Sequence, residues 1–172
     1  MRIDKSIFPN TLTFANLVCG VVSVEQAFHG NYFWAAIFIL LAALADRYDG
    51  KVARYLKVPP TIGKQLDSLA DLISFGMAPG VLAFQMHNFI DLGIIGYALM
   101  CLFPVAGAYR LARFNITEFD GEFYGIPITF AGLFMAVYGL IHVYFPLPAW
   151  LTIILLVVLS YLMVCTHRFK KF

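Results

Sequence analysis

The segment Ala43–Gly76, ALADRYDGKVARYLKVPPTIGKQLDSLADLISFG, decides the fold, because it places four aspartates at the junction of two apolar, helix-forming runs. These aspartates are Asp46, Asp49, Asp67 and Asp71. An ionisable side chain at membrane depth is costly unless it is paired or bound to a cation, so such residues usually mark a functional site. The segment therefore predicts a polar site between two membrane helices.

The rest of the chain is strongly apolar. Of its 172 residues, 61% are hydrophobic and 13% are charged, and the mean hydropathy is +0.80, which excludes a soluble domain of ordinary composition. We expect an all-α integral membrane protein with six transmembrane helices in a single domain over residues 1–172, the second helix continuing as a more polar helix toward Leu56. The six apolar runs cover about 12–28, 32–45, 66–86, 92–112, 126–145 and 150–165.

The basic residues predict the orientation of these helices. Cytoplasmic loops carry the excess of Lys and Arg, and all 12 fall on one side of the six-helix arrangement. We therefore expect a multi-pass protein of the cell membrane with both termini and the aspartate segment facing the cytoplasm. The net charge of +2 follows from this topology and does not indicate a nucleic-acid partner. A simple membrane anchor would show the same asymmetry.

Helical periodicity groups the polar residues of the second helix. At about 100° per residue, Asp46, Asp49, Gly50 and Ala53 share one face, and Arg54 lies at its edge. The two small residues allow another helix or a ligand to approach the carboxylates closely. The arginine, one turn beyond Gly50, is suited to hold phosphate oxygens.

The third helix carries a matching stripe. Gly63, Asp67 and Asp71 follow one another at steps of four, and Pro59 and Pro60 turn the chain between the two helices. Four converging carboxylates repel one another unless divalent cations neutralise them, and all-oxygen ligands favour Mg²⁺, Mn²⁺ or Ca²⁺. Two ions fit the charge best, as in sites that clamp both oxygens of a phosphoryl displacement. Solvated charges at the membrane surface, or an ion or proton pathway, are the alternatives.

The spacing of these residues resembles the signature of the CDP-alcohol phosphotransferase family. The pattern is D-x-x-D-G-x-x-A-R, then eight residues, then G-x-x-x-D-x-x-x-D, and every fixed position is present. FPNTLTFANLVCG at 8–20, SFGMAPG at 74–80 and GAYRLARFN at 107–115 resemble the phosphatidylserine synthase branch. The resemblance implies six membrane helices, a site facing the cytosol and a homodimer.

The resemblance also implies roles for the aspartates and for the residues near the nucleotide. Asp46, Asp49 and Asp67 would bind metal, and Asp71 would activate the acceptor hydroxyl as a base and also touch metal. Gly50 and Arg54 would contact the nucleotide diphosphate. The full set expected at the CDP-activated lipid is Asn10, Thr13, Asp46, Gly50, Ala53, Arg54, Thr61 and Gly63.

The acceptor implied by the branch is L-serine, whose hydroxyl would take the phosphatidyl group of CDP-diacylglycerol or CDP-archaeol and release CMP. Arg110, Arg113 and Asn115 lie at the same membrane face and are the candidates for binding serine. Arginines also anchor helix ends at the cytoplasmic face, and the asparagine is equally suited to cap its helix. Glycerol phosphate or inositol phosphate is the alternative acceptor within the family, and a small cation or proton transporter is the alternative from another class.

Overall fold

Helices make up nearly all of the computed structural model, which describes residues 7–56, 62–116, 123–165 and 168–169. The fourth element is a π-helix, written η1, and η2 is a short 3₁₀ helix. The elements in chain order are α1 (Ile7–Phe28), α2 (Tyr32–Tyr55), α3 (Ile62–Asp71), η1 (Leu72–Met77), α4 (Ala78–Met86), η2 (Phe89–Leu92), α5 (Ile94–Ile116), β1 (Phe123–Tyr124), α6 (Ile128–Tyr144), α7 (Ala149–Val164) and β2 (Arg168–Phe169).

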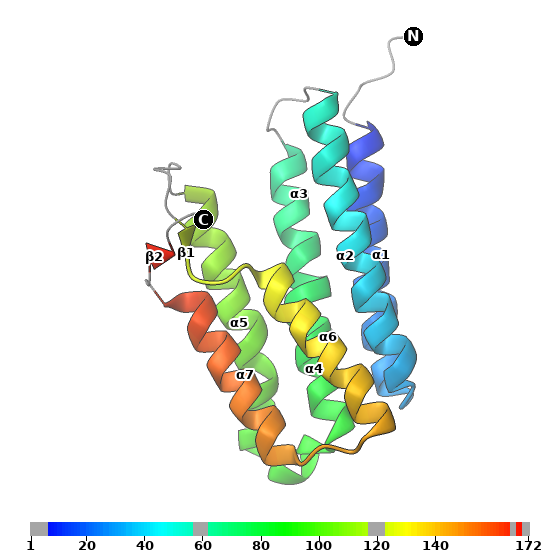
Figure 1. The fold of residues 1–172 in the computed structure, drawn as a ribbon, viewed down its shortest axis with the longest axis vertical. Coiled ribbons are helices and arrows are strands. Elements are labelled where there is room, and N and C mark those ends of the chain that lie inside the picture. The colour runs from blue at the N-terminus through cyan, green and yellow to red at the C-terminus, as the bar shows by residue number, and fades with distance from the viewer. Residues whose placement is uncertain (1–6, 57–61, 117–122, 166–167, 170–172) are drawn as a thin grey trace.

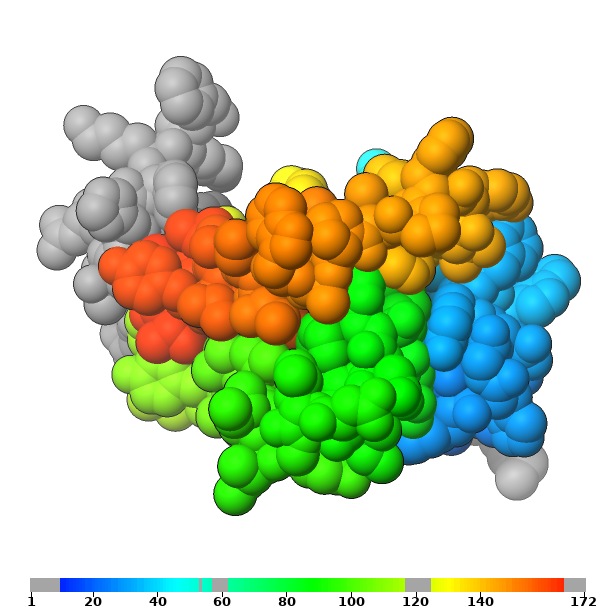
Figure 2. Space-filling view, turned by 90° about the horizontal axis from the view of Figure 1, so that it is seen from below, coloured from blue at the N-terminus to red at the C-terminus, as the bar shows by residue number. Residues whose placement is uncertain are grey.

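The helices lie side by side along the long axis of the molecule (Figure 1). α1 packs against α2, α5 packs against α7, and α3, η1 and α4 form one continuous rod between these pairs. The connections from α1 to α2, from α4 to α5 and from α6 to α7 lie at the lower end, which Figure 2 shows in blue, green and orange. The upper end therefore holds the ends of α2 and α5 and the beginning of α3, where the sequence places the candidate site.

Three of the described helices are long and apolar enough to cross a membrane: Asn10–Phe28, Ile62–Met86 and Ile94–Ile116. α6 and α7 are apolar but have only 17 and 16 residues. α2 has 24 residues, and its second half carries the charged residues of the aspartate segment. The all-helical class is thus confirmed, whereas fewer than the expected six helices reach the length and apolarity of a full span.

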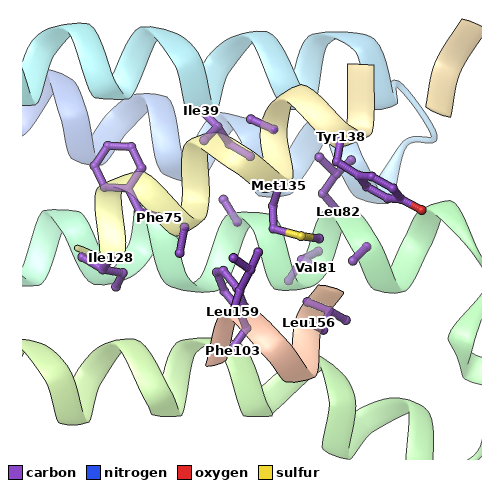
Figure 3. Close-up of a cluster of buried hydrophobic side chains, with 14 of the residues drawn as sticks. Ile39, Phe75, Val81, Leu82, Phe103, Ile128, Met135, Tyr138, Leu156 and Leu159 are labelled. Atoms are coloured by element: carbon purple, nitrogen blue, oxygen red, sulfur yellow. The ribbon is translucent and has the colours of Figure 1, made fainter. Parts of the chain in front are cut away.

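The core lies where η1 and α4 meet α2, α5, α6 and α7 (Figure 3). Gly132 on α6 allows a close approach to η1, since a Cβ atom there would lie 2.8 Å from Phe75 Cα and 2.9 Å from Phe75 O. Close backbone contact through small residues is typical of helix packing in membranes. The largest side chains of this region with 0% exposure are Phe75, Phe103, Ile128 and Leu156.

The π-helix was not anticipated from the sequence. It begins directly after Asp71, and Ser74, Phe75 and Gly76 within it are buried. Single wide turns of this kind are frequent at functional sites. The Ser74 hydroxyl donates a hydrogen bond of 2.9 Å to the main-chain oxygen of Asn16, so the wide turn is fastened to α1.

The helix ends differ from the expected ones by a few residues. α1 begins at Ile7 rather than near 12, α3 begins at Ile62 rather than 66, and α5 continues to Ile116 rather than ending near 112. Hydropathy marks only the apolar part of a helix, whereas main-chain hydrogen bonding continues through polar residues at the ends. The predicted proline turn lies outside the described residues. β1 and β2 form a two-residue antiparallel pair that was also not expected.

Candidate metal-dependent active site

Three of the four predicted aspartates converge. Asp46 and Asp49 on α2 and Asp67 on α3 each offer a carboxylate oxygen, and these oxygens all lie within 4.8 Å of one another. Asp49 is 6% exposed, and the Oδ1 atom of Asp67 is buried without a hydrogen-bond partner. The predicted convergence of four carboxylates is therefore confirmed for three of them.

This donor set fits a hard divalent cation. Carboxylates at this separation repel one another, and an orphaned buried carboxylate oxygen has lost its hydration without gaining a partner. A cation bound among Asp46, Asp49 and Asp67 would remove both costs. The set contains only oxygen, which is the preference of Mg²⁺, Mn²⁺ and Ca²⁺.

Asp71 occupies a different position from the other three aspartates. It is 7% exposed, and its Oδ1 atom accepts a hydrogen bond of 3.0 Å from Nδ2 of Asn16 on α1. Among the described residues the group of mutually close carboxylates does not include it. Asp71 is thus held by a neutral donor one helical turn below Asp67.

The residues predicted at the nucleotide lie around this cluster. Thr13 donates a hydrogen bond of 2.9 Å from Oγ1 to Oδ2 of Asp49, so this residue already contacts the carboxylate cluster. Gly63 faces Asn10, since a Cβ atom there would lie 3.2 Å from Asn10 Oδ1. Gly50 faces open space, because nothing lies within 4 Å of a Cβ atom built on it.

Arg54 lies exposed one turn beyond Gly50 and folds back on its own helix. Its Nε donates a hydrogen bond of 3.0 Å to the main-chain oxygen of Gly50. Its guanidinium is therefore close to the open side of α2. Thr61 and the side chain of Ala53 lie outside the part of the chain that the structure describes.

The three residues predicted at the acceptor differ in their surroundings. Arg110 lies close enough to Asp71 for their charges to interact, its Nε is buried without a hydrogen-bond partner, and its guanidinium stacks 5.7 Å from the ring centre of Phe114. Arg113 instead donates a hydrogen bond of 2.9 Å to the main-chain oxygen of Val164 at the end of α7 and stacks on Tyr109. Of the two arginines, Arg110 is the one with an electrostatic interaction with Asp71.

Asn115 connects α5 to α3. Its Nδ2 donates a hydrogen bond of 2.9 Å to the hydroxyl of Ser68, and its Oδ1 is buried without a partner. The alternative of a helix cap is wrong, because the residue lies in the last turn of α5 and its side chain crosses to another helix. Lys64 lies on the same side, with Nζ 5.5 Å from the ring centre of Phe114.

The sequence interpretation missed Asn16, Lys64 and Ser68. A signal for Asn16 was present, because a polar residue three positions after Thr13 in an apolar run faces the same side of a helix. In the sequence, Lys64 counts only among the 12 basic residues that predict the orientation of the helices. The contact of Ser68 with α5 depends on how two helices pack, which no local pattern reports.

The fold and the site define a class: an all-helical protein with membrane-length apolar helices and an acidic, all-oxygen site at one end of the bundle. The CDP-alcohol phosphatidyltransferase family model matches residues 6–168 of the chain. The chain therefore belongs to the CDP-alcohol phosphatidyltransferase family and is a transferase.

Relatives with assigned names agree with this family. The chain is 34% identical over 169 residues to a CDP-diacylglycerol–serine O-phosphatidyltransferase of Bacillus subtilis (strain 168), a match that covers 95% of this chain and 90% of the relative. It is 36% identical to a protein of that same name from Helicobacter pylori, over 74% of this chain and 54% of the relative. It is 32% identical to an archaetidylserine synthase of Methanothermobacter thermautotrophicus, over 99% of this chain and 75% of the relative.

Proposed function

We propose that the chain is a phosphatidylserine synthase, which transfers the phosphatidyl group of CDP-diacylglycerol, or the corresponding group of CDP-archaeol, to the hydroxyl of L-serine and releases CMP. The observation that carries this proposal is the convergence of Asp46, Asp49 and Asp67 beside Asp71, in a chain whose relatives are serine transferases. A cation or proton transporter would have no use for the accompanying Gly, Ala and Arg positions of the motif.

The carboxylates of Asp46, Asp49 and Asp67 would hold two divalent cations, Mg²⁺ or Mn²⁺, with Asp71 as a further ligand. Such ions, when bound, neutralise charge on the pyrophosphate and stabilise the leaving phosphate. The orphaned oxygen of Asp67 and the mutual closeness of the three carboxylates support this assignment. Ca²⁺ would fit the same oxygen ligands.

Asp71 is the candidate base for the serine hydroxyl. The hydroxyl oxygen forms a bond to the lipid-side phosphorus, the bond from that phosphorus to CMP breaks, CMP leaves with the electron pair, and the proton passes to Asp71. A carboxylate is a weak base for an alcohol, so the proton moves late, when attack has made it acidic. The position of Asp71 below the other three aspartates supports this separate role.

The CDP end of the lipid would bind along the open side of α2. Gly50 leaves room for the diphosphate, and Arg54, bonded to the oxygen of Gly50, has its remaining N–H groups for phosphate oxygens. The contacts of Asn10 with Gly63 and of Thr13 with Asp49 bring the beginning of α1 to the same place. The residues proposed for this region remain Asn10, Thr13, Asp46, Gly50, Ala53, Arg54, Thr61 and Gly63.

The acceptor serine would bind between α3 and α5. Arg110 has a buried N–H group without a partner beside Asp71, which suits a carboxylate two bonds away from the reacting hydroxymethyl group. Asn115 offers its buried, unpartnered Oδ1 to the serine ammonium. Arg113 would act from farther away, because its guanidinium is already engaged with the end of α7.

The proposed setting is the cell membrane, crossed by six helices with both termini and the active site at the cytoplasmic face. The placement of the 12 Lys and Arg residues supports this orientation. It also agrees with the substrates, since free serine and CMP are cytoplasmic solutes. A homodimer is proposed from the family resemblance.

The experiment that tests the function is CMP release by the purified, lipid-reconstituted chain supplied with CDP-diacylglycerol and Mn²⁺. L-serine, glycerol phosphate and inositol phosphate are added one at a time, and the Asp71→Asn variant serves as the inactive control. We expect CMP only with serine. Release with glycerol phosphate or inositol phosphate instead would overturn the acceptor assignment. No release with any acceptor, from CDP-diacylglycerol or from CDP-archaeol, would overturn the proposed function.

A further inference from the structure

Asn16 is a wholly buried polar residue that neither the signature nor the proposed metal site uses. Its side chain is 0% exposed, its Nδ2 donates to Asp71 Oδ1 at 3.0 Å, and its own Oδ1 is buried without a partner. We infer that Asn16 is a positioning residue for Asp71, holding one carboxylate oxygen so that the other faces the acceptor hydroxyl. This inference rests on the proposed function, in which Asp71 is the base.

The orientation of the Asn16 carboxamide follows from its neighbour. If the amide were turned over, its oxygen would lie against a carboxylate oxygen about 3 Å away, with no hydrogen between two acceptors. Nδ2 therefore faces Asp71, and Oδ1 is left unpaired inside the protein. A bond to a charged acceptor is stronger than a neutral one, so it offsets the cost of that unpaired oxygen.

The main chain of Asn16 is hydrogen-bonded too, in addition to its side chain. Its carbonyl oxygen accepts a hydrogen bond of 2.9 Å from Ser74, in the π-helix that begins directly after Asp71. One turn farther along α1, a Cβ atom on Gly20 would lie 2.8 Å from Ser74 Cα, so α1 and η1 touch backbone to backbone. The donor and the carboxylate are consequently parts of one rigid unit, which is what positioning a base requires.

Thr13 repeats the arrangement one turn earlier on α1, where its hydroxyl donates to Asp49 at 2.9 Å. Thr13 and Asn16 are three residues apart and face the same side of the helix. α1 thus supplies one donor to an aspartate of α2 and one to an aspartate of α3. The first half of the motif is fixed to the second half by a helix that carries no part of the motif.

The test compares Asn16→Leu, which removes the donor and keeps the branched shape of the side chain, with the control Ser23→Ala. Ser23 lies two turns away on the same face of α1, is 0% exposed and loses a hydrogen bond of 2.8 Å to the oxygen of Ala35. Serine-dependent CMP release gives kcat and the KM values for both substrates, Mn²⁺ binding is measured separately, and thermal unfolding reports stability.

We expect Asn16→Leu to lower kcat by about 10- to 100-fold, the range for losing one hydrogen bond to a charged group, with the KM for CDP-lipid within about twofold of wild type. Mn²⁺ affinity should fall by much less than kcat, because Asp46, Asp49 and Asp67 stay in place. Ser23→Ala should leave kcat unchanged. An unchanged kcat in Asn16→Leu, or a loss matched by weaker Mn²⁺ or CDP-lipid binding, or an equal loss in Ser23→Ala, would overturn the inference.

A second variant and the activity of the wild-type protein complete the test. If Asn16→Leu does not give a folded protein, Asn16→Ser, smaller and still polar, carries the same expectation for kcat. A wild-type chain that releases no CMP contradicts the proposed function, whereas an active wild type with an unaffected Asn16 variant contradicts only the positioning role. The two failures are therefore distinguishable.

Discussion

At the scale of single residues, the chemistry of the site comes from charge held close together in a place with little water. Each pair among Asp46, Asp49 and Asp67 repels by about 3 kcal/mol or more when both members are ionised, for an effective dielectric constant of about 20 and the separation observed. Removing one carboxylate relieves that repulsion and would also remove a ligand of the proposed metal site. We therefore expect metal binding and the stability of the metal-free protein to respond in opposite directions to the same substitution.

Neutralising any one of these three aspartates should weaken Mn²⁺ binding by at least about tenfold and abolish transfer, because each supplies a charged ligand to a shared cluster. Mn²⁺ binding is measured by electron paramagnetic resonance of the free ion. Asp91→Asn is the matched control, since it removes an exposed carboxylate, bonded to Asn88, from η2 at the lower end. Full Mn²⁺ binding and turnover in Asp46→Asn, Asp49→Asn and Asp67→Asn would contradict the proposed metal site.

Substitutions of the two arginines of α5 should differ in their effect on the KM for serine. Arg110→Lys keeps the positive charge but loses the planar fork beside Asp71, so the KM for serine should rise by about tenfold or more while the KM for CDP-lipid is unchanged. Arg113→Lys loses a bond to the end of α7 and should lower thermal stability instead. If Arg110→Lys keeps wild-type serine dependence, the carboxylate is bound elsewhere and the anchoring interpretation of this arginine is the better one.

Most of the site could be predicted from residue spacing alone, because Asp46, Asp49 and Asp67 lie on stripes that one helix crossing brings together. The hydrogen-bond partners of Asp71 and Asn115 could not be predicted in this way. Asn16 is 55 residues from Asp71 in the chain, and Ser68 is 47 residues from Asn115, so each pairing depends on the relative register of two packed helices. Helical periodicity predicts which face of its helix a residue occupies, but it does not predict which residue of another helix the side chain contacts.

At the scale of helices, two features tie the elements together: the π-helix against α1 at the site, and a polar network at the lower end. In that network Tyr138 and His87 both bond the hydroxyl of Thr152 at 2.6 Å. The main-chain N–H of Leu147 donates to Nδ1 of His142, whose ring centre lies 4.6 Å from that of His87. α4, α6 and α7 are thereby joined through neutral imidazoles.

This network predicts a dependence of stability on pH. Burial, and to a smaller extent the neighbouring His142, lower the pKa of His87 from its ordinary value of 6.5. The unfolded chain then binds more protons than the folded one as pH falls through the ordinary value, so this contribution to stability is present above about pH 6.5 and is lost below it. The measurement is the thermal unfolding midpoint of wild type and His87→Gln between about pH 7.5 and pH 5.

We expect the advantage of wild type over His87→Gln to shrink as the pH is lowered. Comparing the two proteins at each pH removes the titration of the aspartates, which they share. A constant difference across the range would mean that His87 does not change its protonation on folding. A difference that grows as the pH is lowered would mean that folding raises the pKa of His87 instead of lowering it.

At the scale of the whole molecule, the apolar runs predicted the helices but overstated their span. α6 and α7, with 17 and 16 residues, are about 25 Å long at about 1.5 Å per residue, somewhat less than a hydrocarbon core of about 30 Å. The predicted apolar run at 126–145 includes Ile126 and Phe145, although neither residue lies in α6. The π-helix also escaped prediction; in the structure it contacts α1, which is distant in the chain, through the bond from Ser74 to Asn16.

The proposed reaction brings together the helices, the lipid and the acceptor. In it, the serine hydroxyl attacks the lipid-side phosphorus and CMP leaves. The most direct measurement supplies serine labelled with ¹⁸O in its hydroxyl, together with CDP-diacylglycerol and Mn²⁺, and determines the mass of both products. We expect the label to be retained in the serine-containing lipid, CMP to be unlabelled, and the two products to form in equal amounts. Labelled CMP, or CMP released without a serine-containing lipid, would contradict it.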